Sequence, residues 1–466
     1  MSFLGEKGFW LDEALSVQRA SAGWPALWHD ITGSQANMAL YYLLLHGWIR
    51  LGDSELVVRG LSALFAVATV PVVYRLTSRL FGGRAAVTAA LLLALNSFFI
   101  SYAQEARGYS LAILLSAVAT WRFVIAVERS SLRSWAWYAV AASVTLYAHF
   151  FGALVLLAHA ASLVFAHRAH RPWRSALAAG AVIGLAGLPL LWFVAFRDVG
   201  QIDWVPAPRP IDLYNLFATF AGGGGWLPAL AGLSIVSALG LAVRWRGDDG
   251  PERWRLALVV CWFVIPPVLA FVVSAAKPVF QPRFLIVSLV PFVMLVAAGL
   301  ARLRHRAAFA TALAVIAVLS GDRVRAWYDA PDKQWWRAAA QHVSSQAAPG
   351  DAVGFYVYSA RVPFEYYARR HGLADGRVTL VDLASSAFVA GNRQPEPSPE
   401  RIRDLAATHP RVWLVRLQDG TPPGHPLGRY EQSRAIESGL AVNYRLVQQT
   451  PFPGGIRIQL YERTAR

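Results

Sequence analysis

Residues 85–111 read AAVTAALLLALNSFFISYAQEARGYSL. The apolar stretch at 85–101 approaches the length that a helix needs to cross the hydrocarbon core of a bilayer, and a second apolar stretch begins at residue 110. Between them, a short polar loop carries one acid, Glu105, and one base, Arg107. The pattern predicts two membrane-spanning helices that are joined by a charged loop at the membrane surface.

The remainder of the first 320 residues repeats this apolar pattern. Of the 466 residues, 56% are hydrophobic and 15% are charged, whereas soluble domains are about 25% charged. A break at His149 separates two stretches that would otherwise form one over-long helix. We therefore predict a mainly α fold in which residues 1–320 form a polytopic transmembrane helical domain. It has about ten spans, near residues 60–80, 85–101, 110–127, 135–149, 151–167, 175–196, 227–243, 256–275, 284–301 and 307–320.

Basic residues are distributed unevenly between alternate loops. When the segment before residue 60 is left aside, one set of loops holds fifteen Arg residues and the other holds five Lys or Arg residues. Cytoplasmic loops are enriched in Lys and Arg, so the first set is predicted to be cytoplasmic and the second to lie outside. Despite a net charge of +16, this scattering argues against nucleic-acid binding. The first set is Arg75, Arg79, Arg84, Arg129, Arg133, Arg168, Arg171, Arg174, Arg244, Arg246, Arg253, Arg255, Arg302, Arg304 and Arg306.

The sequence changes character near residue 321. Runs rich in β-branched and aromatic residues are typical of strands, and they alternate here with helical patterns. We predict a small extracytoplasmic α/β domain at residues 321–466. Its strands are expected at 354–358, 377–381, 411–416 and 456–461, and its helices near 334–346, 361–371, 399–408 and 430–439.

Two adjacent acids, Asp12 and Glu13, precede the first apolar stretch in WLDEALSV (10–17). Neighbouring residues on a helix point about 100° apart, so the two carboxylates are not expected to face one site equally. One is expected to work in a cleft while the other caps or orients it. The alternative is simple helix capping, because acids are favourable at a helix N-terminus.

Other charged residues lie at predicted span mouths on the same side as Asp12. Glu105 and Arg107 form either a second pair beside the site or a helix end with a snorkelling Arg. Lys277 and Arg283 lie in KPVFQPRFL (277–285), where interfacial anchoring is the alternative for Lys277. His149 is either a helix-end residue or a substrate contact.

These motifs carry a resemblance. WLDEALSV, ANMALYYLLLHGWIRLG (36–52), the stretch from Leu80 to Leu111, YAHFFG (147–152) and QPRFLIVSLVPF (281–292) resemble, in this order, the GT-C membrane glycosyltransferases. The most similar branch is the bacterial one that includes relatives of protein O-mannosyltransferases and the lipid A aminoarabinose transferase. The resemblance extends from residue 8 to about residue 300.

The resemblance implies a polyprenyl-phosphate sugar as donor and a cell-envelope acceptor, on the outer face of the bacterial plasma (inner) membrane. It makes Asp12 the expected general base and Glu105 a supporting acid. Such proteins usually begin with a transmembrane helix before the LDE segment, so we expect the natural gene to encode one more apolar segment upstream. Many also carry His-Pro-Pro where this chain has Asn37-Met38-Ala39.

Transfer of a sugar from a lipid phosphate needs a carboxylate and cations, the residue types that these motifs contain. A carboxylate must take the proton of the acceptor hydroxyl, and cations must stabilise the departing phosphate, for which the planar fork of Arg is suited. Asp12, Glu13 and Glu105 are therefore the catalytic candidates, and Arg107, His149, Lys277 and Arg283 are the substrate-binding candidates. Direct displacement would invert the anomeric configuration.

Several alternatives stay open. A non-catalytic lipid or polysaccharide flippase, or a transporter, would also have many spans, although transporter acids are expected near mid-membrane rather than at span mouths. The sugar, hexose or pentose, and the acceptor, glycolipid, polysaccharide or protein, are not determined by the sequence. No protein metal site is assigned, although a pair of acids could hold a divalent cation beside the phosphate. Tyr41, Tyr42 and His46 are expected on an amphipathic helix at the membrane interface.

Overall fold

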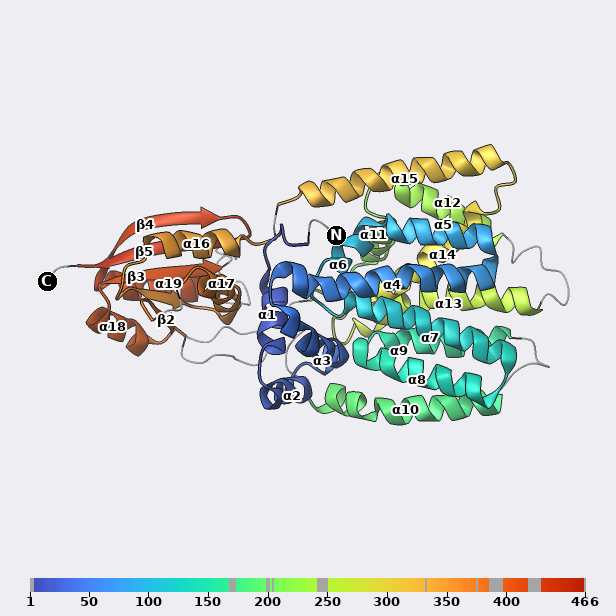
Figure 1. The fold of residues 1–466 in the computed structure, drawn as a ribbon, viewed down its shortest axis with the longest axis horizontal. Coiled ribbons are helices and arrows are strands. Elements are labelled where there is room, and N and C mark those ends of the chain that lie inside the picture. The colour runs from blue at the N-terminus through green and yellow to red at the C-terminus, as the bar shows by residue number, and fades with distance from the viewer. Residues whose placement is uncertain are drawn as a thin grey trace.

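A helical bundle and a small sheet domain make up the computed structural model, and α1, α2 and α3 lie between them (Figure 1). The structure describes residues 4–166, 173–197, 202, 205–240, 250–331, 333–373, 376–384, 397–417 and 429–464. The helices of the first part are α1 (Leu11–Ala20), α2 (Trp24–Gly33), α3 (Ala39–Trp48), α4 (Glu55–Phe81), α5 (Gly83–Ala94), α6 (Ser97–Ala103), α7 (Tyr109–Arg129), α8 (Leu132–Ala148), α9 (Gly152–Ser162), α10 (Trp173–Phe196), α11 (Pro210–Phe220), α12 (Leu227–Leu239), α13 (Gly250–Val273), α14 (Leu289–Leu300) and α15 (Arg306–Asp329).

Membrane-length helices form the bundle, which makes the chain a multi-pass membrane protein. Within the described residues, five helices are long and apolar enough to cross a membrane, namely α4, α7, α10, α13 and α15. A sixth span results if α5 and α6, which are bent by 60°, count as one. Each of the ten apolar stretches that the sequence predicts contains a helix, but the others are shorter.

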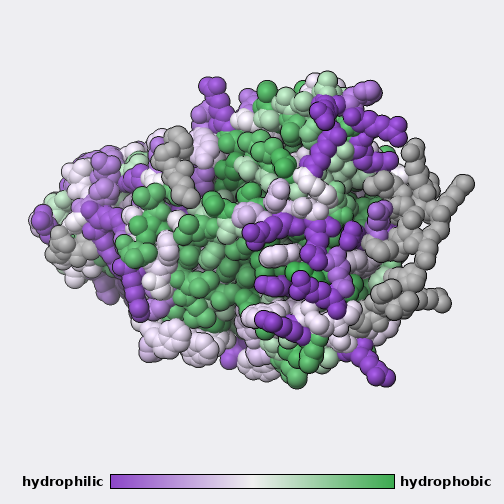
Figure 2. All heavy atoms as spheres, turned by 45° about the vertical axis from the view of Figure 1, so that its right-hand side comes forward, coloured by the Kyte–Doolittle hydropathy of each residue, from purple (hydrophilic) through white to green (hydrophobic). Residues whose placement is uncertain are grey.

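Burial distinguishes the centre of the bundle from its periphery. In α7, 67% of the apolar window is buried within the protein, whereas in α15 only 6% is buried. An apolar helix that is left uncovered by protein needs lipid around it. Figure 2 shows the corresponding apolar zone between the polar C-terminal domain and a polar region toward the other end of the bundle.

The predicted break at His149 is present. Helix α8 ends at Ala148 and α9 begins at Gly152. The side chain of Asn37 fixes the connection, because its Oδ1 accepts a hydrogen bond of 2.9 Å from the backbone N–H of Phe150. A Cβ on Gly152 would lie 2.8 Å from the side chain of Thr145, so the turn back into the membrane requires glycine at this position.

The predicted basic loops meet at one end of the bundle. Glu128, at the end of α7, pairs with Arg79 at 2.6 Å and with Arg255 at 3.2 Å. Arg84 donates to the carbonyl oxygen of Leu303 at 2.9 Å. These contacts join the α4–α5, α7–α8 and α14–α15 connections and the start of α13. Arg168, Arg171, Arg244 and Arg246, which belong to the same predicted set, lie outside the described residues.

The C-terminal domain combines a sheet with helices, as the sequence predicts, and the sheet has five strands where four were expected. The strand order is β2-β1-β3-β5-β4. Strand β1 is parallel to β2 and β3, and β5 is antiparallel to β3 and β4. The elements are α16 (Trp336–Gln346), β1 (Ala352–Phe355), α17 (Tyr358–Arg370), β2 (Thr379–Asp382), α18 (Pro399–Thr408), β3 (Arg411–Leu417), α19 (Arg429–Ala441), β4 (Tyr444–Phe452) and β5 (Ile456–Arg463).

Polar contacts seat this domain on the bundle end that carries α1, here named the domain-facing end. Glu55, at the start of α4, accepts hydrogen bonds from Arg337 at 2.6 Å and from Tyr367 at 2.8 Å. The hydroxyl of Tyr367 in turn accepts from the backbone N–H of Phe9 at 2.6 Å. Arg370 pairs with Asp53 at 2.6 Å. Helix α17 thereby fixes the segment that leads into α1.

Candidate active site

Asp12 lies between two arginine side chains at the domain-facing end. It occupies the first turn of α1, and its Oδ2 is 3.5 Å from Nη1 of Arg283 and 3.8 Å from Nη2 of Arg107. The Asp12 side chain is 20% exposed. Both separations exceed the 2.7–2.9 Å that is usual for a charge-assisted hydrogen bond. Asp12 is therefore surrounded by positive charge without being held tightly by it.

Glu13 points away from this cluster into a tight buried pair. Its two oxygens accept from Nε and Nη2 of Arg59 at 2.7 and 2.6 Å. The remaining guanidinium donors reach the backbone carbonyls of Leu4 at 2.8 Å, Lys7 at 2.6 Å and Gly8 at 3.1 Å. The two neighbouring acids thus diverge, as helix geometry requires.

The same carboxylate also holds the loop that contains Glu105. Oε1 of Glu13 accepts from the backbone N–H of Ala106 at 3.0 Å. Arg59, which the sequence interpretation missed, is therefore the anchor of both the N-terminal segment and this loop. The signal for it was a single Arg at the start of an apolar helix, because a charge there needs a partner.

Arg107 is held by Tyr42, a residue that the sequence interpretation did not count among the site residues. Its Nη1 donates to the hydroxyl of Tyr42 at 2.9 Å, and its buried Nε has no hydrogen-bond partner among the described residues. Tyr41 and Tyr42 are fully buried. Helix α3 packs against α1 and α8, so protein covers both rings; Tyr42 reaches the site, whereas the hydroxyl of Tyr41 bonds Ser62 at 3.0 Å. The interfacial position of α3 itself stays a prediction.

Glu105 is buried, and only one of its two carboxylate oxygens has a hydrogen-bond partner among the described residues. Its Oε2 accepts from Nζ of Lys333 at 3.0 Å, whereas Oε1 has no hydrogen-bond partner in the described part of the chain. Burial raises the pKa of Glu105, and the nearby charges of Glu13 and Asp12 raise it further against the opposing effect of Lys333. Glu105 and Arg107 are thus two residues apart, but their side chains face different partners.

The two remaining candidates, His149 and Lys277, differ in exposure. His149 is buried, and its ring lies 6.0 Å from that of Tyr109 and 5.9 Å from that of Phe284. Its Nδ1 accepts from the N–H of Phe151 at 3.2 Å, and its Nε2 has no hydrogen-bond partner within the described residues. Lys277 is exposed just beyond the end of α13.

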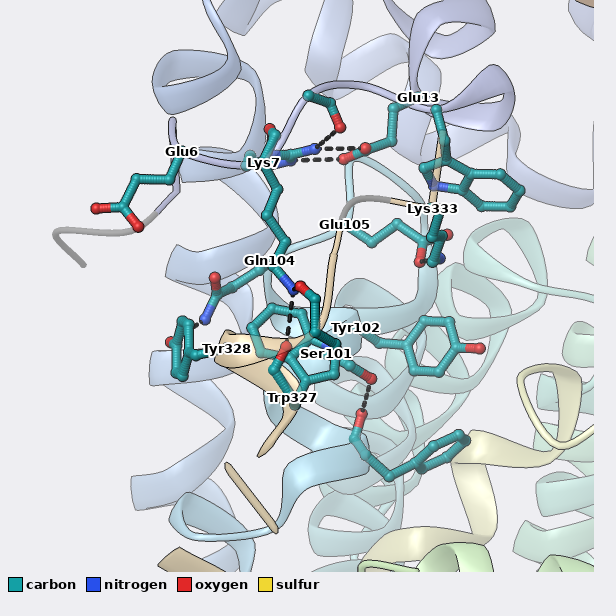
Figure 3. A pocket seen from close by; sticks show the side chains of 15 residues that line it. Glu6, Lys7, Glu13, Ser101, Tyr102, Gln104, Glu105, Trp327, Tyr328 and Lys333 are labelled. Carbon is teal, nitrogen blue, oxygen red and sulfur yellow. Dashed lines mark hydrogen bonds and ion pairs between the residues drawn. The ribbon is translucent and has the colours of Figure 1, made fainter. Parts of the chain in front are cut away.

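A cavity of about 390 Å³ opens beside this cluster, between the segment before α1, the end of α6 and the end of α15. Figure 3 shows Glu105 and Lys333 facing each other in it, with Tyr102, Trp327 and Tyr328 on the side away from Glu13. Glu13 lines the cavity, but Asp12, Arg107 and Arg283 do not. The cavity and the Asp12 cluster are therefore adjacent but separate.

The described acids do not form a cluster of metal ligands. No group of three or more His, Cys, Asp or Glu side chains within the described residues is arranged to hold a metal ion. Glu13 is bound by Arg59, so its carboxylate does not share a cation with Asp12 in this geometry.

Comparisons with known proteins agree with this architecture. The family model for dolichyl-phosphate-mannose-protein mannosyltransferases matches residues 37–193. No curated protein matches the chain in sequence. ArnT from Cupriavidus metallidurans is similar in its apo structure and in its complex with undecaprenyl phosphate. Both have a TM-score of 0.62 and 13% identity, over 97% of this chain and 93% of that chain for the first and 98% and 95% for the second.

A third solved structure shares the fold more distantly. The Archaeoglobus fulgidus oligosaccharyltransferase in complex with Zn and sulfate has a TM-score of 0.52 and 15% identity, over 81% of this chain and 59% of that chain. Together with the mainly helical architecture and the small C-terminal sheet domain, these likenesses confirm the resemblance that the sequence motifs carry. The chain has the fold of the GT-C membrane glycosyltransferases.

Proposed function

We propose that this protein transfers a sugar from a polyprenyl-phosphate donor to a hydroxyl group of a cell-envelope acceptor. The observation that carries the proposal is the position of Asp12 between Arg107 and Arg283. A carboxylate with two guanidinium groups beside it supplies both parts of the reaction, a proton acceptor and a binding site for a phosphate.

Arg107 and Arg283 bind the donor phosphate in this proposal. Guanidinium groups bind phosphate with two parallel hydrogen bonds, and both arginines lie beside Asp12 at separations of 3.8 and 3.5 Å. Lys277, exposed at the mouth, adds positive charge along the approach of the donor.

The reaction needs no nucleotide, because the lipid phosphate of the donor is itself the leaving group. The acceptor oxygen attacks the anomeric carbon, the bond from that carbon to the phosphate oxygen breaks, and the polyprenyl phosphate leaves with the electron pair. Asp12 takes the proton of the acceptor hydroxyl as general base. The two arginines stabilise the growing charge on the leaving phosphate. One displacement of this kind inverts the anomeric configuration.

Glu13 and Glu105 have supporting roles in the proposal. Glu13 positions Asp12 and the 105–107 loop through Arg59, and we assign it no contact with the reacting atoms. Glu105 adds negative charge beside the site and lines the neighbouring cavity. His149 presents a buried Nε2 that has no hydrogen-bond partner among the described residues, and its ring lies beside Phe284, which follows Arg283 in the chain. This position suits a hydrogen bond to the donor.

The comparisons support the class of donor. One of the structures with this fold was determined with undecaprenyl phosphate, and the matching family model describes dolichyl-phosphate-mannose-dependent enzymes. Because the basic loops meet at the opposite end of the bundle, we propose that the domain-facing end and the C-terminal domain lie outside the bacterial plasma membrane.

Mass spectrometry of lipid extracts from cells with and without the gene tests the proposal. Loss of the protein should cause a polyprenyl-phosphate sugar to accumulate and one envelope glycan to lose that sugar. A bacterial strain in which the gene carries Asp12→Asn should show the same accumulation. If Asp12→Asn restored the wild-type pattern while deletion did not, a non-catalytic flippase or transporter would replace the transferase.

A further inference from the structure

Arg122 is a charged residue inside a helix that is apolar enough to cross the membrane. It lies seven residues before Arg129, the last residue of α7, which places it about 10 Å along the axis from that end of the helix. Its guanidinium group has no hydrogen bond or ion pair with a described residue. Charged side chains within membrane spans are rare and nearly always have a partner, so the partner of Arg122 is to be sought outside the described chain.

Two indole rings from neighbouring helices flank this guanidinium group. Its Cζ lies 5.4 Å from the ring centroid of Trp121 and 5.7 Å from that of Trp137. Trp121 precedes Arg122 in α7, and Trp137 belongs to α8, which packs beside α7 (Figure 1). Both separations are typical of cation–π contacts. Because such contacts use the face of the ring, the N–H donors of Arg122 stay available for an anion.

The contact faces the surroundings of the bundle rather than its core. On α8, Trp137 is 51% exposed, whereas Trp135 and Tyr138 are buried. On α7, Phe123 is buried, whereas its neighbour Arg122 is only partly buried. The arginine and its exposed indole are therefore open to the membrane lipid around the helices.

Two further arginines extend this surface toward the end of the bundle. Arg129 follows Arg122 by seven residues, and Arg133 precedes Trp137 by four, so each shares a helix face with the residue that it extends. Both side chains are exposed, and neither has an ion pair with a described residue. The surface formed by Trp121, Arg122, Arg129, Arg133 and Trp137 is here named the Arg122 patch.

The acid closest to the patch in the sequence is already engaged. Glu128 pairs with Arg79 at 2.6 Å and with Arg255 at 3.2 Å. These two arginines belong to α4 and α13, so Glu128 neutralises charge on the neighbouring helices rather than in the patch. The patch therefore carries three positive charges without a carboxylate partner among the described residues.

The chemistry of the patch fits the headgroup of an anionic phospholipid. Guanidinium groups bind phosphate with two parallel hydrogen bonds, and arginine side chains near span ends extend toward the headgroups. Tryptophan rings are favourable at the same level of the bilayer, and basic pockets between membrane helices bind acidic headgroups. Three unpaired positive charges favour a headgroup with net negative charge over a zwitterionic one.

We propose that the Arg122 patch binds the headgroup of an anionic phospholipid in the leaflet opposite the Asp12 cluster, with the guanidinium groups on the phosphate and the indoles beside it. The proposal does not depend on the transferase function. The helices that this lipid joins, α7 and α8, lead at their other ends to Arg107 and His149. A bound lipid therefore stabilises, from the far side of the membrane, the two helices that position these residues.

Native mass spectrometry of the full chain tests the site, after reconstitution in nanodiscs that mix phosphatidylglycerol with phosphatidylcholine. The wild type should retain phosphatidylglycerol in preference to phosphatidylcholine. Arg122→Gln should weaken the binding of phosphatidylglycerol by about ten-fold, because it removes hydrogen bonds to a charged group. Arg122→Lys should recover part of this loss, because it keeps the charge without the fork. Trp137→Leu should weaken binding by about three-fold, through loss of an exposed cation–π contact.

Arg75→Gln is the matched control. Arg75 lies six residues before Phe81, the last residue of α4, and thus at a similar distance from the same end of the bundle. It is exposed and has no ring contact or ion pair with a described residue. Arg75→Gln should bind phosphatidylglycerol as the wild type does. Equal losses in Arg75→Gln and Arg122→Gln would overturn the site and leave Arg122 as an ordinary snorkelling residue.

Thermal unfolding gives a second readout. Phosphatidylglycerol should raise the melting temperature of the wild type but not that of Arg122→Gln, because a ligand that binds only the folded state stabilises it. Similar melting temperatures in phosphatidylcholine alone show that the variant is folded, and Arg122→Lys serves if Arg122→Gln does not fold. Equal retention of the two phospholipids by the wild type would overturn the proposal. If undecaprenyl phosphate displaced phosphatidylglycerol from the patch at equal concentration, a polyprenyl phosphate would replace the phospholipid as its ligand.

Discussion

Asp12 Oδ2 lies 3.5 Å from Arg283 Nη1, although the two residues come from opposite ends of the helical part of the chain. The fold achieves this contact by packing α1 across the mouth of the bundle, where Glu13 and Arg59 fix its first turn. Arg283 is the residue that immediately precedes the short helix η6 (Phe284–Ser288). Because one carboxylate meets two cations that are distant from it and from each other in the sequence, the site exists only in the folded protein.

Arg283→Ala should weaken binding of undecaprenyl phosphate by about 10-fold or more, since hydrogen bonds to charged groups contribute about 1.5–3 kcal/mol. Arg283→Lys should recover part of this loss, because Lys keeps the charge but lacks the two-pronged fork. Equilibrium binding in detergent measures both. Arg209→Ala, on a side chain that is 78% exposed, is the control, and an equal loss in that variant would make the effect non-specific.

Glu13→Gln should lower the free energy of unfolding more than the same substitution at an exposed glutamate does. Breaking a buried ion pair costs about 3–5 kcal/mol, because the partner charge stays buried. Glu365→Gln is the matched control, because Glu365 pairs with Arg361 and Arg369 one turn away on either side and such surface pairs contribute about 0–1 kcal/mol. Thermal unfolding in detergent compares the two. Equal melting temperatures for both variants would contradict the anchoring role of Glu13.

The raised pKa of Glu105 predicts a pH dependence of stability. A Glu whose folded pKa lies above the unfolded value of about 4.3 binds more protons in the folded state, so stability falls as pH rises from the unfolded pKa through the raised one. Glu105→Gln removes this titration. The melting temperature of the wild type should therefore fall relative to that of Glu105→Gln as the pH rises through this window. If the melting temperature of the wild type instead rose relative to that of Glu105→Gln over the same pH range, the raised pKa of Glu105 would be contradicted.

Single-cysteine variants can test the orientation of the protein in the membrane. After Cys261, the chain's one cysteine, is replaced by Ala, a cysteine at the exposed position 277 should react with a membrane-impermeant thiol reagent in intact cells. Cysteines at 129 and 253, both exposed at the opposite end of the bundle, should react only after permeabilisation. Labelling of 129 or 253 in intact cells would invert the proposed topology.

Much of the fold could be predicted because hydrophobic periodicity and length act locally. The break at His149, the divergence of Asp12 and Glu13, and four of the five strands follow from neighbouring residues alone. Strand β4 was missed because it is an edge strand whose residues, YRLVQQTPF, are largely exposed and include a proline. It is held by its backbone hydrogen bonds to β5, and a sequence pattern does not reveal those.

The partners of the site residues depend on long-range packing, so the sequence indicated them only in part. Charged residues at span mouths identified Asp12, Arg107 and Arg283, which the fold brings together. Tyr42 looked like an interfacial residue, because aromatic residues at an interface and in a buried site have the same sequence signature. The pairing of Glu105 with Lys333 crosses from the bundle to the start of the C-terminal domain, and no local pattern connects the two.

Turnover of the Asp12→Asn variant decides whether Asp12 is the general base. The substitution keeps the size and polarity of the side chain but removes its capacity to accept a proton. With the full chain reconstituted in liposomes with the native lipid-linked donor and acceptor, transfer should fall by about 100-fold or more, while binding of undecaprenyl phosphate stays within about two-fold of the wild type, well under the loss of a single charged contact. Wild-type turnover by Asp12→Asn would contradict the mechanism and leave Asp12 as a helix-capping residue.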